Sequence, residues 1–303
     1  MNAIGNTPLI KLEKLSEPRC AEIFVKYEGG NPTGSMKDRM ALSMIEGAER
    51  RGQLKPGDRV VEYTGGSTGS SLAMVCANKG YKAHFVSSDA FAEEKLQTMK
   101  IFGAELEIFP SENRLITAKL IDTLIEKTRE LSKAPNTFWP DQFNNVDNRN
   151  AYHNMAKEII NVLGTHIDEF IMGVGTGGCF SGNAEVLKDN IPSIRCIAIE
   201  PKNVRTLSGG DTSGTHKLEG IGAGFVPSIC RLDLADEIIA VSDEDAYKTA
   251  RALARTEGIW GGTTSGANVW AAIQRARVIG AGKKIVTVIV DSGLKYMRGD
   301  LYR

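Results

Sequence analysis

VVEYTGGSTG, residues 60–69, is the stretch that decides the fold of this 303-residue chain. Its first four residues are typical of a short strand, and the glycines and small polar residues after them are typical of a turn. An amphipathic stretch from Ser70 to Lys79 follows and has the length of a helix. The same plan recurs at residues 170–178 with the turn GVGTGG and at residues 285–293 with the turn DSG. These repeated βα units predict a mostly parallel sheet.

Further strands and helices are predicted between these units from their hydrophobic spacing. Strands are expected at residues 83–86, 105–109, 195–199 and 237–241, and helices at 37–51, 93–102, 114–131, 147–163, 244–257 and 265–279. Within the third of these helices, Ile116, Leu120 and Leu124 share one face, which is typical of a core contact. The stretch at residues 135–150, rich in Asn, Asp and Pro, is the candidate boundary between two α/β lobes. A ligand is expected between the lobes, at the carboxyl ends of the strands.

Composition and charge narrow the classes of partner. Lys plus Arg and Asp plus Glu each number 37, so the formal net charge is zero and no basic field is available for nucleic acid or an anionic membrane. A small neutral or zwitterionic ligand fits better. The sequence shows neither an apolar run long enough for a membrane span nor a signal peptide, so the cytoplasm is the expected compartment.

The cysteines and histidines do not form a metal-binding pattern. The five cysteines are odd in number and widely spaced, which favours reduced, buried thiols over a disulfide framework. No metal-ligand spacing links the four histidines, which are interpreted as structural or surface residues. These residues are Cys20, Cys76, Cys179, Cys196 and Cys230, and His84, His153, His166 and His216.

Two features carry a chemical signal of their own. Lys37 follows a Pro-Thr-Gly-Ser turn at the expected start of a helix, where burial and the helix dipole can lower the pKa of an amine that forms imines. The turn GVGTGG, residues 173–178, fits GxGxxG after a strand, and such turns bind anions through backbone N–H groups. Taken alone, Lys37 is also compatible with a surface lysine, and the glycine turn with tight helix packing.

Four motifs in order carry a family resemblance over nearly the whole chain. They are IGNTPL at residues 4–9, NPTGSMKDR at residues 31–39, EGIGAGF at residues 219–225 and DSG at residues 291–293. The chain resembles the cysteine synthase (O-acetylserine sulfhydrylase) and cystathionine β-synthase family of fold-type II enzymes, which depend on pyridoxal 5′-phosphate (PLP). The resemblance implies the tryptophan synthase β-like fold, with two three-layer αβα lobes and mostly parallel twisted sheets. It implies a smaller, mobile lobe at residues 37–145 and a larger PLP-binding lobe from residues 1–36 and 146–303.

The resemblance also implies roles for individual residues. Lys37 would hold PLP as an imine and later remove the proton from the substrate Cα. Ser292 would face the pyridine nitrogen, and a neutral hydroxyl there suits β-elimination better than transamination. The PLP phosphate would be held by the turn after the middle strand, that is by Gly175, Thr176, Gly177, Gly178 and Cys179. Cys179 stands where the family usually has threonine, so one hydroxyl donor is lost while the backbone N–H remains.

The loop at residues 64–69 would bind the substrate carboxylate, and it departs from the family pattern Thr-Ser-Gly-Asn-Thr-Gly at two positions. Gly65 replaces the loop serine, and Ser67 replaces the asparagine that bonds the PLP 3′ oxygen. Ser67 can still donate there, although its side chain is shorter. The substrate-binding set that the resemblance implies is Thr64, Gly65, Gly66, Ser67, Thr68, Gln142, Gly222 and Ala223.

The leading hypothesis is therefore a PLP-dependent cysteine synthase, a transferase of cysteine biosynthesis. It would replace the acetate of O-acetyl-L-serine with sulfide, through an aminoacrylate, to give L-cysteine. The first alternative is a PLP-dependent β-lyase or dehydratase, such as a cysteine desulfhydrase or serine/threonine deaminase, or a β-synthase with another nucleophile. The second is a non-catalytic α/β binding protein. The resemblance further implies a homodimer and a cleft that can accept the C-terminal tail of serine acetyltransferase.

Overall fold

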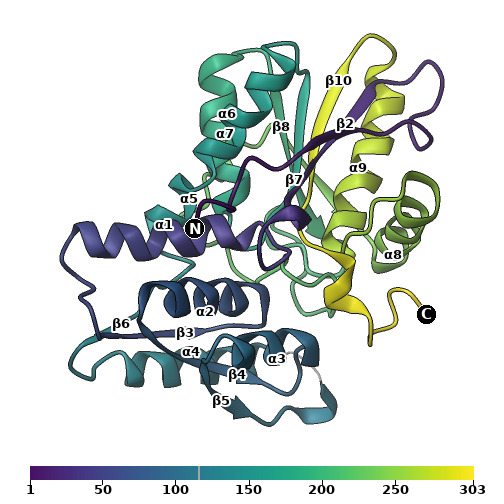
Figure 1. The fold of residues 1–303 in the computed structure, drawn as a ribbon. Coiled ribbons are helices and arrows are strands. Elements are labelled where there is room, and N and C mark those ends of the chain that lie inside the picture. The colour runs from purple at the N-terminus through teal and green to yellow at the C-terminus, as the bar shows by residue number, and fades with distance from the viewer. Residues whose placement is uncertain (115–116) are drawn as a thin grey trace.

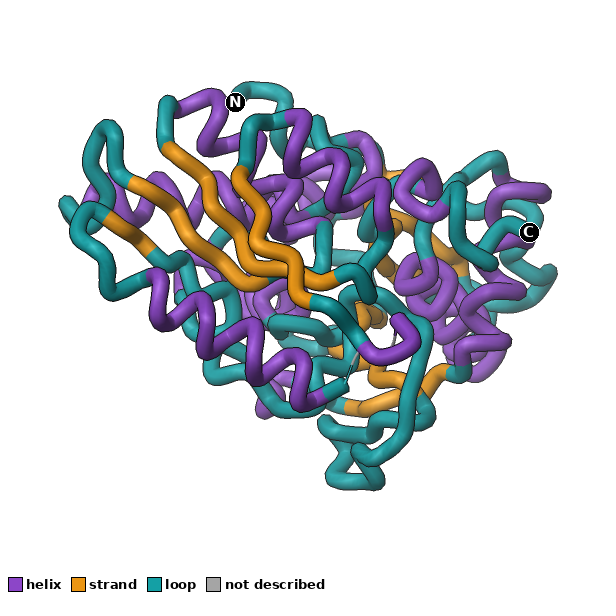
Figure 2. Tube along the Cα trace, turned by 90° about the horizontal axis from the view of Figure 1, so that it is seen from below, coloured by secondary structure: helices purple, strands orange, loops and turns teal. Residues whose placement is uncertain are grey.

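The computed structural model describes residues 1–114 and 117–303. Over these residues the strands form a sheet of six, in the order β1-β2-β10-β7-β8-β9, and a sheet of four, in the order β5-β4-β3-β6. Every neighbouring pair is parallel except β1 with β2. Figure 2 shows the two sheets as separate groups of strands with helices around each. The predicted α/β fold with mostly parallel sheets is confirmed.

The six-stranded sheet joins the two ends of the chain, because β10 lies between β2 and β7. Its strands are β1 (Leu9–Lys11), β2 (Glu22–Tyr27), β7 (Glu169–Gly173), β8 (Arg195–Pro201), β9 (Glu237–Val241) and β10 (Lys284–Ile289). Helices α6 (His153–Leu163) and α7 (Gly178–Asn190) cover one face, and α8 (Asp243–Ala252) and α9 (Thr263–Ile279) cover the other (Figure 1). Burial on both faces explains why β7 reads as an apolar run without alternation.

The four-stranded sheet lies between residues 59 and 138. Its strands are β3 (Arg59–Tyr63), β4 (Lys82–Ser88), β5 (Glu105–Phe109) and β6 (Thr137–Phe138), and its helices are α2 (Ser67–Lys79), α3 (Glu93–Ile101) and α4 (Ala118–Leu131). The predicted stripe on α4 is a core contact, since Leu120 and Leu124 pack against Tyr63 and Val86. Ile116, the first member of that stripe, lies outside the described residues.

Helix α1 (Lys37–Arg50) lies between the two sheets, where it contacts α2 and the short helix α5 (Val146–Asn150) (Figure 1). Met40, Met44 and Ile45 on α1 are fully buried, and one hydrophobic cluster continues from them into both sheets. The lobes are therefore joined by a continuous core around α1. The division into a lobe of residues 37–145 and a lobe of the remaining residues stays a prediction.

Several elements differ from the sequence-based expectation. The helix expected at residues 147–163 is two helices, α5 and α6, and the one expected from residue 114 begins at Ala118, where the Thr117 side chain caps it. The pattern did not predict β1, β2 or β6, and it implied a helix after the turn at residues 173–178, where α7 lies, without giving its bounds. Short helical turns complete the described chain at Glu28–Gly30, Glu112–Arg114, Leu232–Leu234, Leu253–Glu257 and Gly293–Tyr296. Strands β5 and β9 have the predicted bounds.

The cysteines form no disulfide. All five are free thiols, as predicted, but only Cys76, Cys179 and Cys196 are buried, whereas Cys20 and Cys230 are half-buried. No helix among the described residues combines the length and the apolar character that crossing a membrane requires. In the same residues, His, Cys, Asp and Glu side chains form no group of three that could hold a metal ion.

The strand order marks one place as a binding crevice. From β7 the chain continues to β8 and β9 on one side, while β10 lies on the other side of β7. Ligands of open α/β sheets bind beyond the carboxyl ends of the strands at such a change of direction. The turns after β7 and β10 are the predicted phosphate turn and the predicted Ser292 turn.

Candidate active site

The turn that carries Lys37 is attached to the end of β10. The Ser292 N–H donates to the Gly34 carbonyl at 2.9 Å, and the Met36 N–H donates to the Val290 carbonyl at 2.9 Å. Gly34 has a φ of +71°, which favours glycine. A Cβ at this position would also lie only 3.2 Å from the Ser292 Cβ, so a larger residue would crowd Ser292. Lys37 and Ser292, predicted from opposite ends of the chain, are therefore brought to one place.

Lys37 is a buried amine at the first residue of α1, with 9% of its surface exposed. Burial lowers the pKa of Lys37 below its usual value, and the neighbouring Cys179 and Asp291 oppose that shift. Both burial and the positive end of the helix dipole favour the neutral amine, the form that can act as a nucleophile or a base.

The two residues after Lys37 fix the first turn of α1. Asp38 accepts hydrogen bonds from the Thr33 hydroxyl at 2.5 Å and the Ser71 hydroxyl at 2.6 Å, and burial raises its pKa. Arg39 forms two-pronged hydrogen bonds to Glu28 and to Glu158 with distances of 2.7 to 2.8 Å. These pairs orient the Lys37 turn through charge-assisted bonds. Sequence reasoning assigned Asp38 and Arg39 no role of their own.

The turn between β7 and α7 forms a cradle in which side chains are excluded. Gly177 has a φ of +81°, and a Cβ there would lie 2.5 Å from the Cβ of Cys230. A Cβ at Gly175 would overlap the Gly220 carbonyl, and one at Gly178 would overlap the Asn148 side chain. The first turn of α7 has backbone N–H groups without partners inside the helix, so the cradle presents donors and a positive dipole to an anion.

Asn148 connects this cradle to the substrate loop, and no sequence motif pointed to it. Its Nδ2 donates to the Thr176 hydroxyl at 3.1 Å and to the Gln142 carbonyl at 2.7 Å. Its Oδ1 is buried without a hydrogen-bond partner and lies beside Gly178. A buried polar atom of this kind normally has a partner, so a ligand or water in the cradle is expected to supply a donor.

Cys179 does not have the properties of a catalytic thiol. Its thiol is 4% exposed, and burial raises the pKa of Cys179 well above its usual range. Its Sγ and its carbonyl both accept hydrogen bonds from the Asn183 amide, at 3.6 and 2.8 Å. The thiol is therefore neutral and engaged with α7, and what Cys179 can offer an anion is its backbone N–H.

The loop at residues 64–69 is held in shape by its own first residue. The Thr64 hydroxyl accepts from the Gly66 N–H at 3.1 Å and from the Gly69 N–H at 2.9 Å. This leaves Ser67 at the first residue of α2, half-buried and free to face a ligand. Thr68 lies one residue further and donates to the Gln142 Oε1 at 2.8 Å.

Gln142 is a buried member of the site rather than a solvated loop amide. Its Nε2 donates to the Tyr63 carbonyl at 3.1 Å, and its backbone N–H donates to the Glu62 Oε2 at 3.3 Å. Glu62 is itself buried and accepts from the Trp139 indole at 2.9 Å. Burial raises the pKa of Glu62 to about 8, against the lowering effect of the Trp139 hydrogen bond.

Gly222 and Ala223, the last two members of the predicted substrate-binding set, lie beside the phosphate turn. Gly222 has a φ of +70° and donates its N–H to the Val174 carbonyl at 3.1 Å, which places it beside the phosphate turn. Its carbonyl is 3.3 Å from His216 Nε2. Burial lowers the pKa of His216, so the imidazole is neutral at pH 7. Ala223 follows, half-buried, with no hydrogen bond of its side chain available.

A charged pair that the sequence did not reveal joins α3 to the turn that begins at Gly220. Lys95 of α3 is 4% exposed and forms an ion pair with Glu219, just before the Gly220-Ile221-Gly222 turn. Its ammonium lies 4.7 Å from the ring centre of Tyr296. The Tyr296 hydroxyl donates to Asp291 at 2.7 Å, and burial raises the pKa of Asp291. Nothing in the sequence indicated that these two charged residues form a pair, because Lys95 and Glu219 are far apart in it.

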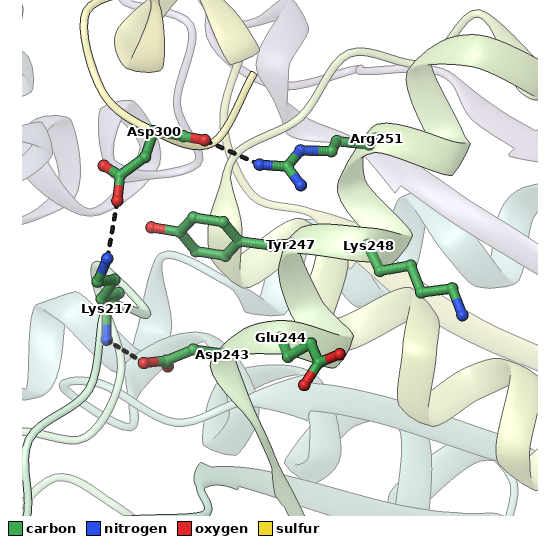
Figure 3. Close-up of a pocket in the computed structure, with 7 residues that line it drawn as sticks. All are labelled: Lys217, Asp243, Glu244, Tyr247, Lys248, Arg251 and Asp300. Carbon is green, nitrogen blue, oxygen red and sulfur yellow. Dashed lines mark hydrogen bonds and ion pairs between the residues drawn. The ribbon is translucent and has the colours of Figure 1, made fainter. Parts of the chain in front are cut away.

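A separate surface pocket of about 510 Å³ lies near the C-terminus (Figure 3). In it, Lys217 forms an ion pair with Asp300 at 2.7 Å, and Arg251 donates to the Asp300 carbonyl at 2.9 Å. None of the predicted site residues lines this pocket. Its lining is Lys217, Asp243, Glu244, Tyr247, Lys248, Arg251 and Asp300.

The residues around Lys37 fit PLP. The cradle that a Cβ would fill and the N-terminus of α7 suit a phosphate. The buried amine of Lys37 suits the aldehyde, and the half-buried Ser292, whose Oγ accepts from the Leu294 N–H at 3.3 Å, has its hydroxyl hydrogen left for a ring nitrogen. The predicted site residues thus converge from the turns after β3, β7 and β10 and from the start of α1.

Comparisons with known proteins agree with this arrangement. The family described as "Pyridoxal-phosphate dependent enzyme" matches residues 1–291. A cysteine synthase of Staphylococcus aureus is 43% identical over 301 residues, which cover 99% of this chain and 95% of that protein.

Solved structures show the same likeness in three dimensions. The cysteine synthase of Entamoeba histolytica superposes with a TM-score of 0.93 at 36% identity, covering 99% of this chain and 89% of that one. A hydrogen sulfide-producing enzyme of Fusobacterium nucleatum superposes with a TM-score of 0.91 at 40% identity, covering 98% of both chains.

Proposed function

Because the chain belongs to the family of pyridoxal-phosphate dependent enzymes, we propose that it is a cysteine synthase. In this reaction the acetate of O-acetyl-L-serine is replaced by sulfide to give L-cysteine. The observation that carries the proposal is the position of Lys37, a buried amine fixed beside Ser292 and close to the N-terminus of α7. The full-length similarity to the cysteine synthase of Staphylococcus aureus supports it.

The cofactor would be held by three turns. Gly175, Thr176, Gly177, Gly178 and Cys179 would bind the phosphate at the start of α7. Ser292 would bond the ring nitrogen, and Ser67 the 3′ oxygen. When bound, PLP withdraws electrons from the substrate Cα and makes the proton on that carbon acidic. Asn148 would support the cradle, because its Nδ2 donates to the Thr176 hydroxyl and orients that side chain.

Lys37 would move the proton. Its lowered pKa leaves a fraction of neutral Nζ that can take the proton from the substrate Cα and return it when the product forms. The Gly34 and Met36 hydrogen bonds to the end of β10 would limit the positions that this amine can reach.

The substrate carboxylate would lie at the start of α2. Thr64, Gly65, Gly66, Ser67 and Thr68 form this end of the helix, where backbone N–H groups and the helix dipole attract an anion. The Gln142 Oε1 accepts from the Thr68 hydroxyl, and the second N–H of its Nε2, which already donates to the Tyr63 carbonyl, would be available to the carboxylate. Gly222 and Ala223 would lie on the other side of the substrate. Closure of the lobe at residues 37–145 over this space would exclude water.

The experiment is a spectrum and a product assay on purified protein. Holoenzyme should show a visible cofactor band, and it should convert O-acetyl-L-serine and sulfide into L-cysteine with release of acetate. A Lys37→Ala variant should lose the band that depends on the lysine. Protein that takes up no PLP would support the non-catalytic alternative instead.

A second candidate function is a β-lyase that releases hydrogen sulfide from L-cysteine. It is favoured by the 40% identity to the hydrogen sulfide-producing enzyme of Fusobacterium nucleatum and by the changed loop positions Gly65 and Ser67. Sulfide release from L-cysteine, without synthesis from O-acetyl-L-serine, would establish this function in place of the first.

We also propose a cytoplasmic homodimer, on the basis of the family resemblance. A carboxylate at the end of a peptide has the same chemistry as a substrate carboxylate, so the C-terminal tail of serine acetyltransferase could occupy the same end of α2. Light scattering of the purified protein tests the dimer, and competition between such a peptide and O-acetyl-L-serine tests the tail.

A further inference from the structure

The glycine at position 65 is required by a neighbouring ring and not by its own backbone. Gly66 has a φ of +149°, which favours glycine, whereas Gly65 is not among the residues with positive φ. A Cβ at position 65 would lie 2.8 Å from Cε1 and 3.0 Å from Cδ1 of Phe91. Side chains do not approach a ring this closely, so Phe91 excludes a side chain at position 65.

Phe91 is a fixed part of the smaller lobe. It follows β4 in a turn where its N–H donates to the Ser88 carbonyl at 3.2 Å. Its ring packs at the edge of the hydrophobic cluster that contains Tyr63, Val86 and Leu120. Because the half-buried ring packs against this cluster, moving it aside would cost the contacts it makes there.

The first turn of α3 covers the next residue of the loop with the side chain of Lys95. The methylene groups of Lys95 lie where a Cβ at Gly66 would stand, with its Cγ 3.1 Å from that position. Beyond the loop, the Lys95 ammonium pairs with Glu219. Residues 91–95 therefore cover both Gly65 and Gly66, one with a ring and the other with a charged side chain.

We infer that Phe91 is a positioning residue of the substrate site, which determines how the loop at residues 64–69 binds the substrate carboxylate. Its ring takes the space of a side chain at position 65, so the loop binds the substrate carboxylate through backbone N–H groups and without a hydroxyl at that position. This inference rests on the proposed function, because it requires the start of α2 to be the carboxylate subsite. It predicts that the effect of a serine at position 65 changes sign when the ring is removed.

The test uses holoenzyme and four proteins: wild type, Gly65→Ser, Phe91→Ala and the double variant. The dissociation constant of L-serine is measured from the shift of the cofactor absorbance. With Phe91 present, Gly65→Ser should weaken binding about tenfold, because the loop must shift to relieve the overlap. In the Phe91→Ala background, Gly65→Ser should tighten binding about tenfold over Phe91→Ala alone, as a hydrogen bond to a carboxylate does.

Gly65→Ala is the matched control, because it adds the Cβ without the hydroxyl. It should weaken binding when Phe91 is present and have no effect in the Phe91→Ala background. If Gly65→Ser does not fold with Phe91 present, comparison of Phe91→Ala with the double variant still tests whether the serine tightens binding once the ring is removed. A serine at position 65 that acts in the same direction in both backgrounds, or has no effect in either, overturns the inference. Wild-type protein that binds L-serine but makes no cysteine overturns the proposed function alone, since the sign reversal is still measurable.

Discussion

The Asn148 side chain donates a hydrogen bond to the Thr176 hydroxyl at 3.1 Å, while its own Oδ1 has no partner. The same amide nitrogen donates to the Gln142 carbonyl at 2.7 Å. One side chain thus holds together the phosphate turn and the loop that contacts the substrate end of α2. An amide in this position keeps the Thr176 hydroxyl oriented.

Asn148→Ala is expected to weaken PLP binding about tenfold, because Thr176 and Gln142 lose a shared buried donor. Asn148→Asp should weaken it further, since a carboxylate would face the phosphate with the same charge. Titration of the apoprotein with PLP, followed by absorbance, gives both dissociation constants. Asn190→Ala, at the exposed end of α7, is the control. An aspartate variant that binds PLP as tightly as wild type would contradict this role.

Lys37→Ala should lower the rate of proton exchange at the substrate Cα by a factor of about 10² to 10⁴, the contribution of a positioned acid–base group. Exchange is measured by NMR as deuterium incorporation into L-cysteine or L-alanine in heavy water. Lys14→Ala, at an exposed position, should leave the rate unchanged. If exchange persists at the wild-type rate in PLP-loaded Lys37→Ala, another group is the base.

The raised pKa of Glu62 predicts that the free energy of unfolding depends on pH. Burial raises its pKa from the usual 4.5 to about 8 in the folded protein, so the folded state binds the extra proton. Its contribution to stability is complete below about pH 4.5 and is lost as pH rises towards 8. Glu62→Gln should reduce the loss between pH 5 and 8 by at least about 1.4 kcal/mol, the value of one pKa unit. Denaturant unfolding at both pH values measures this, and parallel curves for the two proteins would contradict it.

The Lys95–Glu219 pair predicts an asymmetric response to neutralisation. Lys95 is 4% exposed, whereas the Glu219 side chain is 35% exposed. Glu219→Gln leaves a buried cation without its partner, while Lys95→Met leaves a carboxylate that water can reach. Glu219→Gln should therefore lower the free energy of unfolding more than Lys95→Met does. Urea denaturation of both variants checks the order, and the reverse order would show that Asp291 or Tyr296 is the main partner of Lys95.

The fold was predicted correctly from the sequence wherever a single strand is followed directly by a recognisable turn. The turns after β3, β7 and β10 were identified because glycine and small polar residues follow an apolar run. Strand β2 was missed, since its Lys26 reads as a surface residue. In the structure, Lys26 is 2% exposed and its ammonium bonds the Thr7 carbonyl and Glu158. A partner this distant in sequence leaves no local pattern.

Helix α7 and Phe91 show the same limit at the candidate site. Gly178 and Gly182 give α7 a low intrinsic helix propensity, and both are needed because Asn148 and the Arg149 carbonyl approach them closely. Gly65 was recognised as a departure from the family pattern, but the ring that excludes a side chain there belongs to the loop after β4. Contacts between loops determine which residue can stand at each of these positions. Helix propensity and hydrophobic periodicity carry no information about such contacts.

The attachment of the Lys37 turn to β10 has a consequence for the order of events during synthesis. Met36 and Gly34 emerge from the ribosome early, but their partners Val290 and Ser292 are made more than 250 residues later. The lysine therefore cannot reach its final environment before β10 has been made, since β10 must first insert between β2 and β7. Stable loading of the proposed cofactor would have to wait for that insertion.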